Sequence, residues 1–333
     1  MLGGFFALLS AATFAFNNAS LRRGVLTGSV AQAMAITVPI GVPIFLFTAA
    51  VTGSLVAVTE FSNKALLMLA AAGVIHFIWG RYCNYRATRA IGTNLTAPVQ
   101  QSNLIISLGL AIWILGETLT PLRLLGIGLI LLGPYYALRQ KNKDDAPTAG
   151  DAVGASIKTE PLAFQPRYAE GVIFSLLSAT GYGVSPILVR IGLEGKGLGV
   201  SIAGGLIAYS AATAVMALLL LWPGQLRHAL AMKPESAKWF TLSGVMVCIS
   251  QMFLFMAMSI APVTVVSPIN RLSVMFRLYF SRLINPQHEI FGGRIIIGTV
   301  VSLLGAVALS LSTDVAASMV PEALRPLLQW HWP

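Results

Sequence analysis

Long apolar segments alternate with short polar ones along the chain, and this pattern predicts membrane-spanning helices. The apolar runs cover roughly residues 3–21, 30–52, 64–85, 95–115, 121–138, 170–190, 199–222, 238–257, 263–284 and 292–312. Most of them approach the length of about 20 residues with which a helix crosses a hydrocarbon core of about 30 Å. We therefore predict an all-α polytopic membrane protein with ten transmembrane helices.

The composition agrees with a chain that lies mostly in lipid. Apolar residues make up 56% of the 333 and charged residues 10%, and the mean hydropathy is +0.77. Soluble domains carry roughly 25% charged residues. The net charge of +10 comes from Lys and Arg that lie mostly between the apolar runs, so we expect a lipid bilayer as surroundings and no nucleic acid as partner.

One long polar segment divides the chain. Residues 139–168 are rich in charge, Ala, Gly and Pro, a composition typical of a flexible linker. We predict a first five-helix repeat at 1–138, the linker at 139–168, a second five-helix repeat at 169–312 and a C-terminal tail at 313–333.

The two halves are similar to each other span by span. Offsets of 168, 170 and 172 residues align them, pairing Ser10 with Ser178, Pro98 with Pro268, and Glu117 with Glu289. A unit with an odd number of spans reverses direction when it is repeated, so the second half would lie upside down. Transporters often consist of such inverted repeats, with the substrate site between them near the middle of the membrane. We expect two inverted five-helix repeats around a central cavity.

Three sequence motifs carry a resemblance to a known group of proteins. They are GETLT (116–120) followed by Gly126 and Gly133, HEIF (288–291) followed by Gly298 and Gly305, and YRATRAIGTNLTAPVQQ (85–101). On these motifs the chain resembles the drug/metabolite transporter superfamily, and within it the ten-span EamA-type transporters. The resemblance covers both halves apart from the linker and the tail. It implies a ten-helix fold with a central cavity, and the export or exchange of small metabolites, often amino acids.

Polar residues recur along one face of the predicted fourth span. They are Thr96, Gln100, Asn103 and Ser107, and their repeat partners in the ninth span are Val266, Asn270, Ser273 and Arg277. The spacing of four, seven and eleven residues keeps a row on one side of a helix. Because lipid cannot satisfy polar groups, such rows face a bundle interior or a wet cavity. We interpret these rows as cavity walls; interhelical hydrogen bonding without transport is the alternative.

Arg277 is the strongest candidate for a substrate-binding residue. It lies well inside its predicted span, where a guanidinium costs roughly 2.5–3.5 kcal/mol on insertion scales. We find no carboxylate in these spans to pair with it, so we expect an anionic group of the substrate to do so. Arg271 and Arg81 are second candidates, and Asn17 in the first span is a weaker one.

Glu117 and Glu289 are interpreted as structural residues. Each precedes a predicted helix, where a carboxylate favours the positive end of the helix dipole. The glycines at 126 and 133, and at 298 and 305, recur every seven residues and would let a neighbouring helix approach closely. The alternative for the two glutamates is a role in proton coupling.

Neither catalysis nor a bound cofactor is indicated. The sequence lacks HExxH, GxSxG and P-loop motifs and any Cys/His cluster with metal-ligand spacing, so we expect no enzyme, no metal and no cofactor. We expect a monomeric secondary transporter, an exporter or exchanger of an amino acid or organic anion in the cell inner membrane, working by alternating access. A membrane enzyme and a non-transporting scaffold or receptor are the alternatives.

Loop charges suggest an orientation. On one side of the predicted spans lie Arg22, Arg23, Arg86, Arg89, the linker cations, Arg227, Lys233, Lys238, Arg282 and Arg294; on the other lie Lys64, Arg123, Arg190, Lys196 and Arg325. The positive-inside rule places the first side in the cytoplasm and both termini outside. The family resemblance implies the reverse.

Overall fold

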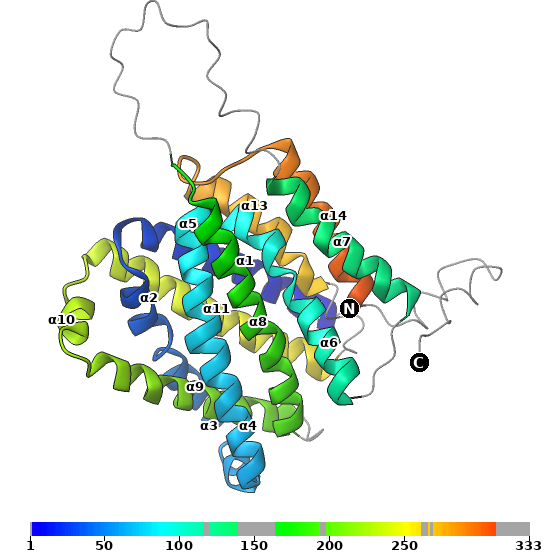
Figure 1. The fold of residues 1–333 in the computed structure, drawn as a ribbon. Helices are drawn as coiled ribbons and strands as arrows, with labels where there is room; N and C mark the ends of the chain where they lie inside the picture. Colours follow the sequence, from blue (N-terminus) through cyan, green and yellow to red (C-terminus); the bar gives the residue numbers. More distant parts are fainter. Residues whose placement is uncertain are drawn as a thin grey trace, which may run out of the picture.

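The computed structural model describes residues 2–115, 120–138, 164–193, 198–260, 266 and 269–310, and all regular structure within these ranges is helical (Figure 1). The helices are α1 (Leu2–Thr27), α2 (Val30–Thr37), α3 (Gly41–Val51), the 3-10 helix η1 (Val56–Glu60), α4 (Asn63–Gly73), the π-helix η2 (Val74–Gly80), α5 (Arg81–Gln100), α6 (Asn103–Leu115), α7 (Pro121–Leu138), α8 (Tyr168–Leu193), α9 (Leu198–Leu220), α10 (Gln225–Leu230), α11 (Pro234–Ile260), α13 (Ser273–Ile284) and α14 (Gly293–Ser310).

Seven helical segments of the described chain are long and apolar enough to cross a bilayer. Large apolar side chains also cover the outer surface; Trp113 is 82% exposed and Leu221 is 76% exposed. A polytopic helical membrane protein is therefore confirmed. The number of ten spans stays a prediction, because α6 and α13 have only 13 and 12 residues and the segment from Asn63 to Leu110 counts as one span.

The predicted third and fourth spans meet at a sharp reversal inside α5. Gly92 has φ +80° and ψ 169°, which interrupts the helix. The side chains of Asn84 and Gln100 nevertheless form a hydrogen bond of 2.8 Å. Sixteen residues of straight helix would separate them by roughly 24 Å. The chain therefore folds back on itself at Gly92.

The predicted fourth and ninth spans are not continuous helices, and this corrects the expectation. The fourth is interrupted between α5 and α6, where the N–H of Gln101 donates to the carbonyl of Pro98 at 3.2 Å. The ninth is interrupted before α13, where Leu272 donates to Ile269 at 3.0 Å. Both are bonds of the tighter i→i+3 type, which often mark a local change of helix geometry. A proline three residues before the first break removes one donor from the helical ladder.

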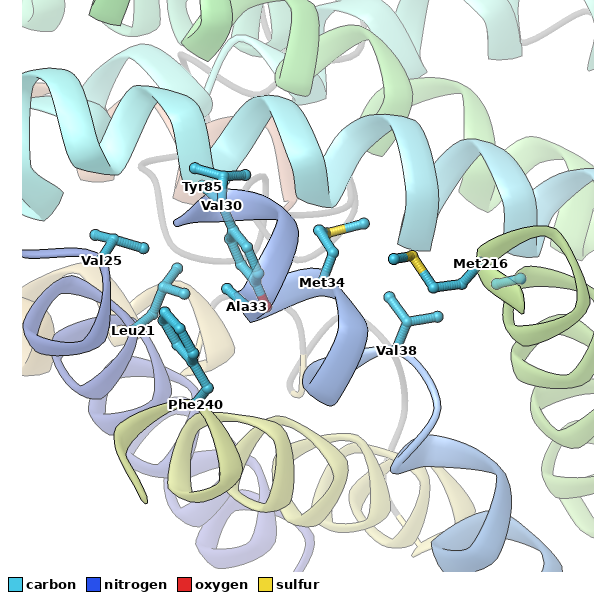
Figure 2. Packing of buried hydrophobic residues seen from close by; sticks show 10 residues of the cluster. Leu21, Val25, Val30, Ala33, Met34, Val38, Tyr85, Met216 and Phe240 are labelled. Carbon is cyan, nitrogen blue, oxygen red and sulfur yellow. The ribbon is translucent and has the colours of Figure 1, made fainter. Parts of the chain in front are cut away.

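The apolar core lies between α1, α2, α5, α9 and α11. Figure 2 shows Leu21 and Val25 of α1, Met34 of α2 and Phe240 of α11 within this cluster. The close approach of α11 to the end of α1 depends on a small residue: a Cβ added to Gly28, which directly follows α1, would lie 2.7 Å from a carbon of the Phe240 ring. Burial of a side chain of this size is worth about 1.5–3 kcal/mol.

α7 and α14 lie side by side along their length (Figure 1). A Cβ added to Gly126 would lie 2.9 Å from the carbonyl oxygen of Gly305, and a Cβ on Gly133 would lie 2.5 Å from that of Gly298. The glycines singled out in the sequence therefore lie at the contact between these two helices. Backbones that approach this closely gain packing where no hydrophobic effect operates within the membrane.

Candidate functional site

Arg277 is held inside the bundle by α13. It is 4% exposed, and its Nη1 donates to Oε1 of Gln100 at 3.5 Å, which is a long hydrogen bond. Its Nε is buried and has no hydrogen-bond partner. Among the residues that the structure describes, no carboxylate forms an ion pair with it. Arg277 is thus a buried cation with incomplete hydrogen bonding and, within the described part of the chain, no ion pair.

Gln100 connects Arg277 to two further helices. Its Nε2 donates to Oδ1 of Asn84 at 2.8 Å and to Oγ of Ser178 at 3.3 Å. Ser178 in turn donates to the carbonyl of Gly80 at 2.9 Å. The fold-back at Gly92 brings Asn84 and Gln100 together, and α8 supplies Ser178. A polar group contributed by α5, α8 and α13 therefore lies in the middle of an otherwise apolar bundle.

A second buried cation, Arg81, lies in a different polar group. Its Nη1 donates to the carbonyl of Thr37 at 2.6 Å and its Nη2 to the hydroxyl of Tyr209 at 3.2 Å. The guanidinium also lies 4.8 Å from the centroid of the Phe77 ring, within the range of a cation–π contact. In the described part of the chain, no carboxylate pairs with Arg81 either.

The remaining predicted residues are only partly brought together. Thr96 is buried and donates to the carbonyl of Gly92 at 2.6 Å, and Asn17 accepts from Ser243 at 2.6 Å. Ser273 and Val266 are buried. The other predicted residues of the two rows are half-buried, as is Arg271; they are Asn103, Ser107 and Asn270. The break after Gln100 separates the first polar row into two parts, so it does not form one continuous face as expected.

Asn84, Thr37 and Tyr209 belong to these polar groups but were not predicted. A signal existed for Asn84, since a buried amide within an apolar span must find a partner. Thr37 and Tyr209 carry no comparable pattern, and only their tertiary contacts with Arg81 reveal them.

Glu289 lies in the segment between α13 and α14 and accepts three hydrogen bonds. The donors are the backbone N–H of Thr93 at 2.6 Å, its hydroxyl at 2.7 Å and the N–H of Asn94 at 3.1 Å. These N–H groups begin the second half of α5, directly after Gly92, where no helical partner exists for them. Glu289 therefore lies at a helix N-terminus as expected, but that helix is α5 and not α14. Its repeat partner Glu117 lies outside the described residues.

Arg22 completes this network and is fully buried. It donates to the carbonyls of His288 (2.6 Å from Nη2), Thr88 (2.8 Å) and Arg89 (3.1 Å). Its Nε lies 3.6 Å from Oε1 of Glu289. In the sequence Arg22 was counted among the loop cations, but α1 extends to Thr27 and carries this residue into the bundle.

Residues 1–139 match the family model described as "EamA-like transporter family". This segment is an EamA-like transporter domain. The family belongs to the drug/metabolite transporter superfamily, so the expected relationship is confirmed. A solved structure described as "Crystal structure of protein" is 18% identical, covers 96% of this chain and 98% of its own, and has a TM-score of 0.47. No match was found among curated proteins.

The EamA-like domain supplies one side of each buried network. It contains Arg22, Arg81 and Gln100, whereas Arg277 and Glu289 lie beyond its matched range. The family matched by residues 1–139 consists of membrane transporters, which fits the expectation of a non-enzyme. No group of three potential metal ligands occurs among the residues described.

Proposed function

We propose that this chain is a secondary transporter of a small anionic or zwitterionic metabolite, an amino acid or organic anion. In this proposal it acts as a monomer in the cell inner membrane by alternating access between two inverted five-helix halves. Arg277 binds the negative group of the substrate, and Gln100, Asn84 and Ser178 complete the polar surroundings.

The observation that carries this proposal is the incomplete bonding of Arg277. A guanidinium has five N–H donors, yet in the described part of the chain Arg277 forms one hydrogen bond, to Gln100, and its Nε has no partner. A buried charged group without partners is expensive, at about 1–3 kcal/mol or more for the desolvation alone. A substrate carboxylate would supply the missing acceptors, and its two oxygens match the planar fork of the guanidinium.

Repeat-related contacts support the inverted architecture. Ser10 Oγ donates to the carbonyl of Ser250 at 2.9 Å, and Ser178 Oγ donates to the carbonyl of Gly80 at 2.9 Å. Ser178 is the repeat partner of Ser10, and Gly80 precedes Ser250 by 170 residues, the offset that aligns Pro98 with Pro268. The same hydrogen bond thus occurs twice, once with the donor in each half.

The contact between α7 and α14 also relates the two halves reciprocally. Adding 172 converts Gly126 into Gly298 and Gly133 into Gly305. The observed contacts join Gly126 to Gly305 and Gly133 to Gly298, so exchange of the two halves converts each contact into the other. Such reciprocity is expected when a pseudo-two-fold axis runs through an interface.

The broken helices lie where a substrate site is expected. The break at Gln101 and the break at Leu272 are 171 residues apart, so they occupy nearly equivalent places in the two halves. Discontinuous helices at equivalent positions of inverted repeats typically flank the binding site of a transporter. Arg277 and Gln100 lie next to these breaks, which supports their assignment to the substrate site.

The test is a ligand screen on purified protein, followed by transport in proteoliposomes. Amino acids, carboxylates and phosphorylated metabolites are added singly; a ligand at 100 times its Kd should stabilise the folded state by about 2.7 kcal/mol and raise Tm. Arg277→Gln should abolish this stabilisation and the uptake of the same compound, whereas Lys64→Gln, an exposed control, should retain both. Failure of every anionic and zwitterionic compound, with no loss on Arg277→Gln, would leave a non-transporting scaffold as the better description.

A further inference from the structure

Two cavities adjoin at the edge of the bundle formed by α2, α5, α9 and α10, and Arg277 lines neither of them. The first, of about 350 Å³, is lined by Ser29, Val30, Ala31, Tyr82, Arg86, Arg89, Gln225 and His228. The second, of about 310 Å³, is lined by Ala31, Met34, Ile78, Trp79, Tyr82, Met216, Leu219, Leu220, Trp222, Gln225 and Ala229. Ala31, Tyr82 and Gln225 border both, so the two cavities are direct neighbours, and we treat them together as one site with two different ends.

The first cavity is cationic. Arg86 is 37% exposed at its side chain and pairs with Glu170 at 2.6 Å, but Arg167 also pairs with Glu170 at 2.8 Å. One carboxylate therefore faces two guanidinium groups. Arg89 is exposed, and among the described residues its side chain has no ion pair. The imidazole of His228 lies beside them with Nε2 at 2.8 Å from Oγ of Ser29. This end carries net positive charge and open donors.

The second cavity is apolar and aromatic. Its lining includes Met34 and Met216, which belong to the buried cluster shown in Figure 2, and Trp79 and Trp222, which are 50% and 73% exposed. Ile78 lies eleven residues before Arg89 in the sequence, which corresponds to roughly 16 Å along a helix. The site therefore has a cationic end at Arg89 and an apolar end at Ile78.

α10 lies in the connection between α9 and α11 (Figure 1), and its residues Gln225, His228 and Ala229 line the two cavities. Leu226 and Leu230 of α10 are 51% and 77% exposed, and Trp222 precedes the helix. Tryptophan and short helices with exposed leucines are typical of the membrane–water interface. We therefore expect the cationic cavity at headgroup depth, on the side of the membrane where most of the loop cations occur.

We infer that this site binds an anionic phospholipid, with the phosphate held by Arg86, Arg89 and His228 and one acyl chain lying between Trp79, Met216 and Leu219. The charge of the first cavity complements a phosphodiester, and the apolar second cavity excludes a purely polar anion as the complete occupant. Basic pockets between transmembrane helices recognise anionic headgroups in this way. The inference concerns a site separate from Arg277 and holds whether or not the proposed transport occurs.

The experiment compares lipids added to the purified chain in a neutral detergent. Phosphatidylglycerol should raise Tm and remain bound in native mass spectrometry, whereas phosphatidylcholine with the same acyl chains should do neither. Arg89→Gln should weaken phosphatidylglycerol binding about fivefold, the effect of one cation near an anionic headgroup. Arg294→Gln, which removes one positive charge on the same side of the membrane, is the matched control and should bind like the wild type.

The apolar end is tested separately. Ala229→Phe, which fills the second cavity, should reduce bound phosphatidylglycerol, while Leu230→Phe at the neighbouring exposed position should not. Equal binding of the two lipids, or equal losses in Arg89→Gln and Arg294→Gln, would overturn the inference. Equal stabilisation by free sn-glycerol 3-phosphate would also overturn it, because the occupant would then be a small anion and not a lipid.

Discussion

Arg22 and Arg277 are both buried guanidinium groups in helices of a membrane protein, yet their surroundings differ. Arg22 donates to the carbonyls of three residues and has Glu289 at 3.6 Å. Arg277 has one long hydrogen bond and a buried Nε without a partner. A guanidinium whose nitrogens all have hydrogen-bond partners within the protein connects elements of the fold. A guanidinium that lacks some of these partners is suited to bind an acceptor group of a ligand. Both side chains are buried, so the number of hydrogen-bond partners distinguishes the structural arginine from the candidate binding arginine.

The Arg22 network should be the more sensitive of the two to substitution. We expect Glu289→Gln to lower the free energy of unfolding by roughly 3–5 kcal/mol, because it leaves Arg22 as an uncompensated buried charge. The measurement is thermal or denaturant unfolding of the purified protein in detergent. Glu170→Gln is the control: it removes the two partly exposed ion pairs with Arg86 and Arg167 and should cost about 1 kcal/mol or less for each pair. Equal costs for the two variants would show that Glu289 is not a buried partner of Arg22.

A substitution at Gly92 tests the Arg22–Glu289 network by changing the backbone conformation beside it. Its φ of +80° and ψ of 169° lie in a region used almost only by glycine, and an added Cβ would lie 2.9 Å from Cδ of Glu289. We expect Gly92→Ala to cost roughly 1–3 kcal/mol of stability. Gly109→Ala is the matched control, since a Cβ there meets no atom within 4 Å and should change stability by less than about 1 kcal/mol. A tolerated Gly92→Ala would contradict the fold-back at this residue.

Paired substitutions at the two arginines give the direct comparison. Arg22→Met should destabilise the protein by roughly 3–5 kcal/mol, whereas Arg277→Met should be nearly neutral or stabilising, because it removes a buried charge that lacks a full set of partners. Unfolding in detergent without added substrate measures both. If Arg277→Met destabilised the protein as strongly as Arg22→Met, Arg277 would be a structural residue and the substrate site would have to lie elsewhere.

The sequence predicts the helical membrane fold and the candidate Arg277, but it fails at two kinds of feature. Hydropathy reports the environment of a whole segment, so it identifies the apolar runs around Arg277 and Gln100 without detecting the breaks beside them. Loop charge counts treat Arg22 as a surface cation because it lies at the end of an apolar run. Its partners come from segments 66 to 266 residues away, and no local pattern reports contacts over such distances. Glycines are an intermediate case, since their seven-residue spacing predicts close packing without naming the partner helix.

His288 offers the smallest and most specific test of the Arg22 network. Burial, together with the positive charges of Arg23 and Arg22, lowers the pKa of His288 below its usual value of 6.5. The folded state therefore favours the neutral imidazole, and stability contributed by this preference is complete above pH 6.5 and declines as the pH falls below it. Between pH 7.5 and 5.5, we expect the free energy of unfolding to fall more for the wild type than for His288→Gln. The difference should be less than about 1.4 kcal/mol per pH unit. Parallel plots of unfolding free energy against pH for the two proteins would mean that the imidazole does not interact with the buried cation. A difference between the plots that disappears in the Arg22→Met background would attribute the effect to Arg22.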